Sequence, residues 1–171
     1  MARVNVNQIE VLEAIAEHLA QELGLDPRQA YVTLSPENPA IPPGGDSWYA
    51  VSPGEGRFDT ELATADVREQ LNEDTVVSIT GYTRLFLDDA DRDAQLLLEE
   101  TRGLLAVKKS ILDAMAGADV KLDDGDTFLR ELMTPQFASA PQKGTIDPDD
   151  LCLPIAWISV DFSCSFDWDL D

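Results

Sequence analysis

Acidic residues at regular spacing are the first feature of this sequence that could do chemistry. Asp89, Asp91 and Asp93, with Glu100 at the twelfth position, copy the ligand spacing of an EF-hand calcium loop. The sixth position of such a loop needs glycine for its sharp turn, and here it is Ala94. The residues before Asp89 have the composition of a strand rather than of an incoming helix. We therefore interpret these acids as the start of a helix, keep calcium as a weaker alternative, and expect no metal site.

A second group of acidic residues and the two cysteines are the other candidates for metal or redox chemistry. Asp123, Asp124 and Asp126 surround a glycine and predict a solvated turn, with loose cation binding as the alternative. Cys152 and Cys164 lie 12 positions apart and form no C-x-x-C motif. Twelve extended residues span ~40 Å, so the two thiols cannot pair along one strand. We expect both to be small buried side chains in a reducing compartment.

The sequence offers no complete catalytic set. Its one histidine, His18, lies off the apolar face of a predicted helix, so we expect it to be exposed. There is no G-x-S-x-G, Walker or G-x-G-x-x-G motif. Trp48, Tyr49 and Trp168 are expected to be core or interface aromatics. We therefore expect a protein that is not an enzyme, with no catalytic residues and no cofactor.

The charge of the chain excludes several kinds of partner. Its 171 residues include 33 acidic and 12 basic side chains, for a formal net charge of −21. Such a surface repels phosphate, so we expect no binding to duplex DNA at ~0.15 M salt and no docking on anionic lipid. No apolar run approaches the ~20 residues that span a bilayer, and the N-terminus lacks the apolar stretch of a signal peptide. A hydrophobic content of 44% supports one folded domain over residues 1–171.

Two helices are predicted from apolar periodicity. The first runs from a cap at Asn7 to Leu23, with Glu10 at capping-box spacing and Gly24 as its stop. The second is the longest expected element, from Asp89 to Met115, and would lie across the sheet. The apolar face of the first helix is expected to contain Ile9, Leu12, Ile15, Ala16, Leu19 and Leu23.

Four segments have the pattern of strands. Three are Tyr31–Leu34, Ser47–Val51 and Val76–Phe86, in which Gly81 indicates a bulge or a close backbone approach. The fourth alternates apolar and polar residues from Ile158 to Leu170, which predicts one dry face and one wet, acidic face. At ~43 Å this strand is longer than the usual 17–20 Å, so we expect it to bend or to reach a neighbouring chain. The apolar positions are Ile158, Val160, Phe162, Cys164, Phe166, Trp168 and Leu170.

The order of these elements predicts an α+β fold: an open, mostly antiparallel sheet with a long helix packed across it and a shorter N-terminal helix. This order, with a last strand that ends in Phe162-x-Cys164-x-Phe166-x-Trp168, resembles the tail terminator and neck proteins of tailed viruses. The segment 35–72 departs from that family and is interpreted as an insertion, and 134–150 as a surface excursion.

The resemblance implies a non-enzymatic virion protein made in the host cytoplasm. Members form rings, often hexamers, that join the tail tube to neck or connector proteins and let DNA pass without specific binding. An acidic lumen suits that passage because it does not hold phosphate. Salt adaptation is a second explanation, since only four lysines occur. The alternative function is a DNA-mimic inhibitor, whose acids would bind a basic partner.

Overall fold

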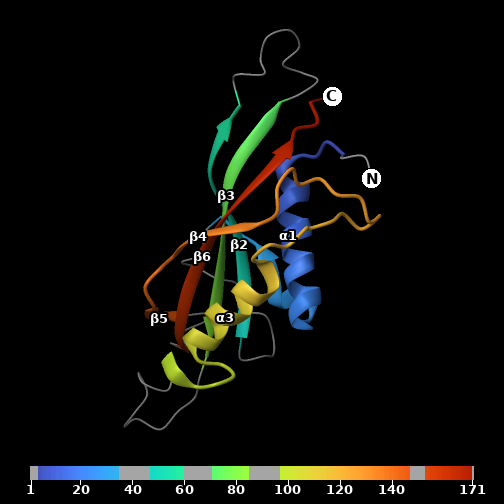
Figure 1. Cartoon of the computed structure of the whole chain (residues 1–171). Coiled ribbons are helices and arrows are strands. Elements are labelled where there is room, and N and C mark those ends of the chain that lie inside the picture. The colour runs from blue at the N-terminus through green and yellow to red at the C-terminus, as the bar shows by residue number, and fades with distance from the viewer. Residues whose placement is uncertain (1–3, 35–46, 60–70, 85–96, 147–152, 171) are drawn as a thin grey trace.

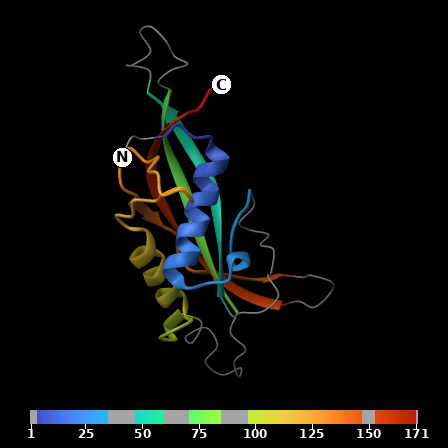
Figure 2. The same ribbon diagram turned by 90° about the vertical axis from the view of Figure 1, so that its right-hand side faces the viewer.

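The computed structural model describes residues 4–34, 47–59, 71–84, 97–146 and 153–170. Two helices and a short 3-10 turn accompany a six-stranded sheet, so the fold is α+β (Figure 1). Both helices pack on one face of the sheet, where the main core lies (Figure 2). The elements in chain order are α1 (Gln8–Leu23), η1 (Pro27–Gln29), β1 (Ala30–Val32), β2 (Ser47–Phe58), β3 (Asn72–Thr83), α3 (Leu104–Met115), β4 (Thr134–Ala138), β5 (Gln142–Ile146) and β6 (Leu153–Asp167).

The sheet is mixed and mostly antiparallel. Its strand order is β1-β2-β3-β6-β4, with β5 beside β6 as well, and only the β1–β2 pair is parallel. β3 pairs with β6 without a break, from Asn72 opposite Asp167 to Thr83 opposite Ala156. β4 and β5 occupy the other edge of β6. Of the two expectations for this long strand, a bend or contact with a neighbouring chain, the second is not needed for its pairing, because β3 lies on one side of β6 and β4 and β5 lie on the other.

The two faces of β6 differ, as its alternation predicts. Ile158, Val160 and Phe162 are buried on the helix face. The other face is less exposed to solvent than expected. Ser159 and Thr80 form a 2.7 Å hydrogen bond across the strands, and the Asp161 carboxylate accepts one from Ser78. That side of the sheet therefore carries a ladder of paired hydroxyl and carboxylate groups rather than a row of free acids.

The ends of α1 match their predicted caps. The Asn7 side chain accepts a 3.0 Å hydrogen bond from the backbone N–H of Glu10, whose carboxylate accepts one of 2.9 Å from the N–H of Asn7. Gly24 closes the helix with a φ of 62°, a conformation that favours glycine. Ile9 is 68% exposed rather than part of the apolar face. Val11 is buried instead, so the apolar face begins two residues after its predicted position.

The second helix is shorter than predicted. α3 has 12 residues and α1 has 16, so the longer helix is the N-terminal one. Residues 99–103 are not helical, and 89–96 lie outside the described residues. In this break the Glu99 carboxylate accepts hydrogen bonds from the backbone N–H groups of Thr101 and Arg102. These bonds replace the helical ladder, and Gly103 fits the turn because a Cβ there would lie 2.5 Å from the Glu99 carbonyl oxygen.

Gly81 marks a close approach of α3 to the sheet. The pairing on both sides of this residue continues in register, so there is no bulge here. A Cβ on Gly81 would lie 2.2 Å from Cγ1 of Val107 and 3.2 Å from Cδ1 of Ile111. The missing side chain lets α3 sit directly on β3. The helices also contact each other, since Nε2 of His18 lies 3.3 Å from the Ala114 carbonyl oxygen. His18 is thus half-buried rather than exposed.

The proposed insertion, 35–72, and the expected surface excursion, 134–150, both contribute strands to the sheet, the first of them over the predicted strand Ser47–Val51. Within 35–72, β2 lies between β1 and β3, and residues 35–46 and 60–70 are outside the described part. The interpretation of 35–72 as an insertion stays a prediction. Within 134–150, β4 and β5 pair with β6, although the side chains of β4 are mostly exposed. Pro135 is compatible with β4 because that strand is at the edge of the sheet.

The buried face of β6 can be tested at Phe162, which is fully buried. We expect Phe162→Ala to lower the free energy of unfolding by ~3–5 kcal/mol, because it removes apolar contacts and leaves a cavity. Phe137→Ala is the matched control, since Phe137 is 66% exposed and its change should be nearly neutral. Urea unfolding followed by tryptophan fluorescence measures both. Equal effects of the two variants would contradict the face assignment.

The contact between α3 and Gly81 gives a second prediction. Alanine in a strand is normally favoured over glycine by ~0.5–1 kcal/mol. Here the added methyl group overlaps Val107, and overpacking of this kind costs ~1–3 kcal/mol. Gly81→Ala should therefore destabilise the protein.

The double variant Gly81→Ala, Val107→Ala should recover part of that loss, since it removes the overlapping Cγ1. Thermal melts of the two single variants and the double variant form the cycle that measures the coupling. If the effects of the two single substitutions on the Tm are strictly additive, α3 does not pack against residue 81.

Candidate interaction site

The far end of the β2–β3 hairpin extends past the N-terminal end of α1 (Figure 1). β1 pairs with β2 only at residues 49–51, so the rest of β2 has no strand on its outer edge among the described residues. The residues from Gly54 to Phe58 are all exposed, and Phe58 is 53% exposed. We call residues 54–58 the hairpin end. It presents an aromatic side chain and a cation, Arg57, to solvent.

The base of the hairpin end is held firmly by the end of β6. The Trp168 indole N–H donates a 2.7 Å hydrogen bond to the Glu73 carboxylate, which lies against Gly56. The Asn72 side-chain amide donates to the Phe166 carbonyl oxygen over 2.8 Å. Asn72 and Glu73 are both buried. These bonds fix the direction in which Arg57 and Phe58 project, so the hairpin end is presented by a rigid support.

Arg57 makes no ion pair with another residue of the described part of the chain. The ion pairs found there join Arg28 to Asp26, Lys109 to Asp113 and Arg130 to Asp167. In a chain with 12 basic side chains against 33 acidic ones, an exposed arginine without such a pair is unusual. Its guanidinium group is available to a carboxylate on another molecule.

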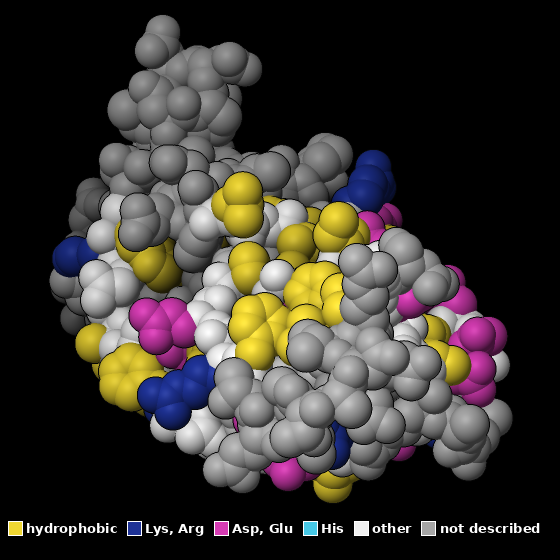
Figure 3. All heavy atoms as spheres, turned by 90° about the horizontal axis from the view of Figure 1, so that it is seen from above, with side chains coloured by type: hydrophobic (Ala, Val, Ile, Leu, Met, Phe, Trp, Pro, Cys, Tyr) yellow, Lys and Arg dark blue, Asp and Glu magenta, His cyan; other side chains and the backbone are white. Residues whose placement is uncertain are grey.

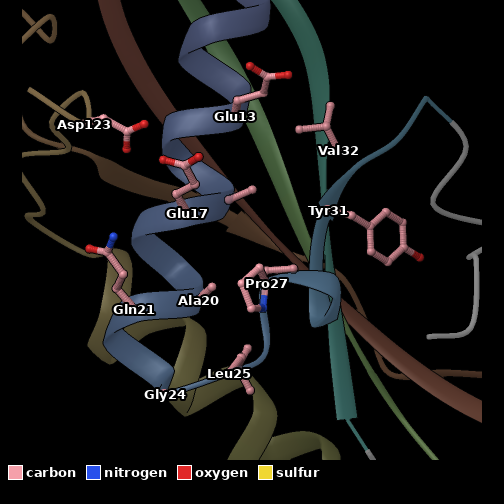
Figure 4. Close-up of a pocket in the computed structure, with 12 residues that line it drawn as sticks. Glu13, Glu17, Ala20, Gln21, Gly24, Leu25, Pro27, Tyr31, Val32 and Asp123 are labelled. Atoms are coloured by element: carbon pink, nitrogen blue, oxygen red, sulfur yellow. The ribbon is translucent and has the colours of Figure 1, made fainter. Parts of the chain in front are cut away.

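A groove of about 870 Å³ lies between α1 and the segment that leads through η1 into β1 (Figure 4). Leu25, Pro27 and Val32 contribute apolar surface to it. Glu13 and Glu17 project from α1, and Asp123, which also lines the groove, lies on the side of α1 away from β1 and faces Glu17. The groove therefore combines an apolar wall with three carboxylates. The apolar face of α1 is turned to the core, which leaves these acids at the groove.

The carboxylates of the groove disfavour one another. The pKa of Glu17 is raised above its ordinary value, first by burial, then by its hydrogen bond with Asp123, and then by the negative charges of Asp123 and Glu13. A raised pKa means that the folded state holds the proton of Glu17 more tightly than the unfolded chain does. A positive charge placed in the groove would relieve the same repulsion.

The acids singled out in the sequence do not form this groove, apart from Asp123. Asp89, Asp91 and Asp93 lie outside the described residues, and Glu100 is exposed in the turn before α3. Among the residues that the structure describes, no group of three or more His, Cys, Asp or Glu side chains is arranged to hold a metal ion.

The acidic turn at 122–126 is confirmed. The Gly125 N–H donates to the Leu122 carbonyl oxygen over 2.8 Å, and Gly125 has a φ of 81°. The Asp126 N–H donates to the Asp124 side chain over 2.9 Å. The turn thus satisfies its own backbone and places Asp123 beside α1.

Cys164 and the aromatic pair at Trp48 are structural. Cys164 is a buried free thiol, and burial, followed by the charges of Glu73 and Asp74, raises its pKa to about 12. A thiol of that pKa is not a nucleophile near neutral pH. Trp48 stacks on Tyr82 with ring centroids 5.4 Å apart, in a small apolar cluster on the sheet face opposite the helices. Cys152 lies outside the described residues.

The apolar face predicted for the first helix leaves Glu13 and Glu17 on its outer side, but no sequence pattern singles out the groove or the hairpin end. The groove depends on the path of the chain through Pro27 into β1, which no local pattern specifies. The only signal for Arg57 and Phe58 was their position after a Pro-Gly-Glu-Gly run within a strand pattern.

Comparisons with known proteins found matches among solved structures. No protein-family model and no curated protein matches the chain. The chain is similar to one from the virion of a native gene transfer agent particle, with 19% identity over 94% of this chain and 99% of that one. The TM-score is 0.45, so the function proposed below rests on the contacts of this chain itself. None of the described helices is long and apolar enough to cross a membrane.

The repulsion at Glu17 predicts how stability depends on pH. Because the pKa of Glu17 is raised in the folded state, Glu17 contributes stability at low pH. That contribution is lost as the pH rises from 4.5, the ordinary pKa of the group, through its raised pKa. We expect Glu17→Gln to raise the Tm at pH 7 and to flatten the pH dependence above 4.5. Glu131→Gln makes the same change in net charge at an exposed position and should leave both nearly unchanged. Equal shifts in the two variants would contradict the local repulsion.

Proposed function

We propose that this protein is a structural component of a virion, a tail terminator or neck protein that forms a ring at the head-proximal end of the tail. The observation that carries the proposal is the rigid hairpin end, which holds Phe58 and Arg57 away from the body of the molecule. Single exposed apolar side chains are common at protein surfaces, and Phe137 is more exposed than Phe58. Phe58 differs in its place on a fixed, projecting support, where an aromatic side chain can contact another subunit of an assembly.

The position of the hairpin end favours a ring over a two-fold dimer. It lies at one end of the molecule, whereas the groove lies along α1 and β1 (Figures 1 and 4). Two different surfaces that contact each other make a head-to-tail interface, and such interfaces close into rings when the rotation allows. When the molecule is viewed from the hairpin end, apolar side chains gather in a patch with acidic side chains on either side (Figure 3).

The charge suits a ring through which a genome passes. The net charge of −21 opposes retention of phosphate in a lumen. The tail-tube protein below and a neck or connector protein above are the proposed neighbours, with six copies as the expected number. The virion is also the setting of the gene transfer agent chain, although that likeness carries none of the weight.

The proposal predicts a salt-dependent assembly that is present in particles. Six copies carry six times −21, or −126 formal charges, so the ring should tighten as salt screens the repulsion. Native mass spectrometry and sedimentation across a salt series measure the stoichiometry. Electron microscopy of purified virions should then place the chain between head and tail.

Absence of the chain from purified particles would overturn the proposal. A monomer that instead captures a basic nucleic-acid enzyme would support the inhibitor function.

A further inference from the structure

We propose that Arg57 and Phe58 of one copy dock in the groove between α1 and β1 of the next copy. This inference rests on the proposed ring and specifies its subunit contact. Arg57 and Phe58 are adjacent in β2 and point to opposite faces of the strand. Phe58 would therefore lie on the apolar wall of the groove, and the Arg57 guanidinium would lie on the opposite side of the inserted strand end, among the carboxylates. The occupant is thus a second copy of this chain, and the contact is head to tail.

The groove has the size and lining that two such side chains require. Its volume of about 870 Å³ is within the ~300–1,000 Å³ typical of binding pockets. Leu25, Pro27 and Val32 supply apolar surface for an aromatic ring, and Val32 is itself 40% exposed. A bulky aromatic on a fixed support loses little conformational entropy when it enters such a groove.

Charge complementarity selects the cation. Glu13, Glu17 and Asp123 surround the groove, and the raised pKa of Glu17 shows that they already repel one another. Arg57 is exposed and makes no ion pair with any other described residue. Asp74 lies opposite Arg57 in the β2–β3 register but forms no ion pair with it, so docking gains attraction without breaking an existing bridge. Arginine also offers a planar group that can contact two carboxylates at once.

The form of the hairpin end favours docking by side chains over the addition of a strand. The pairing of β2 with β3 shifts register between Pro53 and Gly56, and such bulges twist an edge away from a new strand. Pro53 also lacks a backbone donor. What remains accessible at this end is the set of side chains that follow the bulge.

The first test is a charge reversal with rescue, measured as the association constant by sedimentation in concentrated protein. Arg57→Glu should weaken association by ~10-fold or more. Glu17→Arg should weaken it as well, and the double variant Arg57→Glu, Glu17→Arg should recover most of the loss. Lys109→Glu makes the same change in net charge on the exposed face of α3, and should have only the small general effect. A double variant no better than the worse single variant would overturn the inference.

The second test locates the contact. Phe58 is replaced by the photoreactive benzoylphenylalanine, and the variant is mixed with isotopically heavy protein and irradiated. Cross-linked peptides should join Phe58 of the light chain to residues 13–32 of the heavy chain. Cross-links to another segment, with association intact, would overturn the docking while leaving the ring in place.

The docking surfaces are complete in two copies of the chain, so association needs no other virion protein. Salt screens the attraction of Arg57 to the groove as well as the repulsion between copies, so a parent protein that stays monomeric at high concentration at every salt concentration from ~0.15 M to ~1 M would overturn the docking. The ring itself would then be decided by the images of purified particles. Failure of this inference and failure of the proposed function are thus separate results.

Discussion

The pairing of β3 with β6 is the constraint on which the rest of the structure depends. Its register sets Val77 opposite Phe162 and Ile79 opposite Val160, so one face of both strands is apolar and carries the helices. The same register sets polar residues opposite each other on the other face, where they form the hydroxyl and carboxylate ladder. A slip of one residue would exchange the two faces of one strand and bury its polar groups without partners. Gly81 then decides how closely α3 can approach this paired surface.

The excess of acid constrains the surface in the way that the β3–β6 register constrains the core. With 33 acidic side chains among 171 residues, carboxylates take up a large share of the surface, and some lie beside one another. At most sites water separates them at little cost. In the groove, Glu17 and Asp123 share a hydrogen bond and Glu17 is partly desolvated, so the repulsion is felt as a raised pKa. In a strongly acidic chain there are therefore places where a cation would be stabilising, even though no metal-binding geometry exists among the described residues.

The features that could be predicted from the sequence are those that depend on local patterns of residues. The capping box of α1 and the alternation of β6 each depend on neighbours within a few residues, and both were confirmed. The long second helix failed because the periodicity of its apolar residues continues through a break that Glu99 and Gly103 impose by hydrogen bonds and close contact. β4 and β5 were missed because prolines argue against strands, yet a proline is acceptable at a sheet edge. The groove was missed because it is formed by elements whose relative placement is tertiary.

The shortness of β1 links the fold to its proposed use. β1 covers only residues 49–51 of β2, so among the described residues the sheet ends early on this side and β2 continues paired with β3 alone. An exposed strand edge of this kind invites uncontrolled pairing with other chains. The bulge between Pro53 and Gly56 blocks that pairing while leaving the side chains beyond it accessible. The hairpin end is therefore closed to strand addition but open to recognition by shape and charge. An edge of that kind can assemble with one partner without aggregating with many.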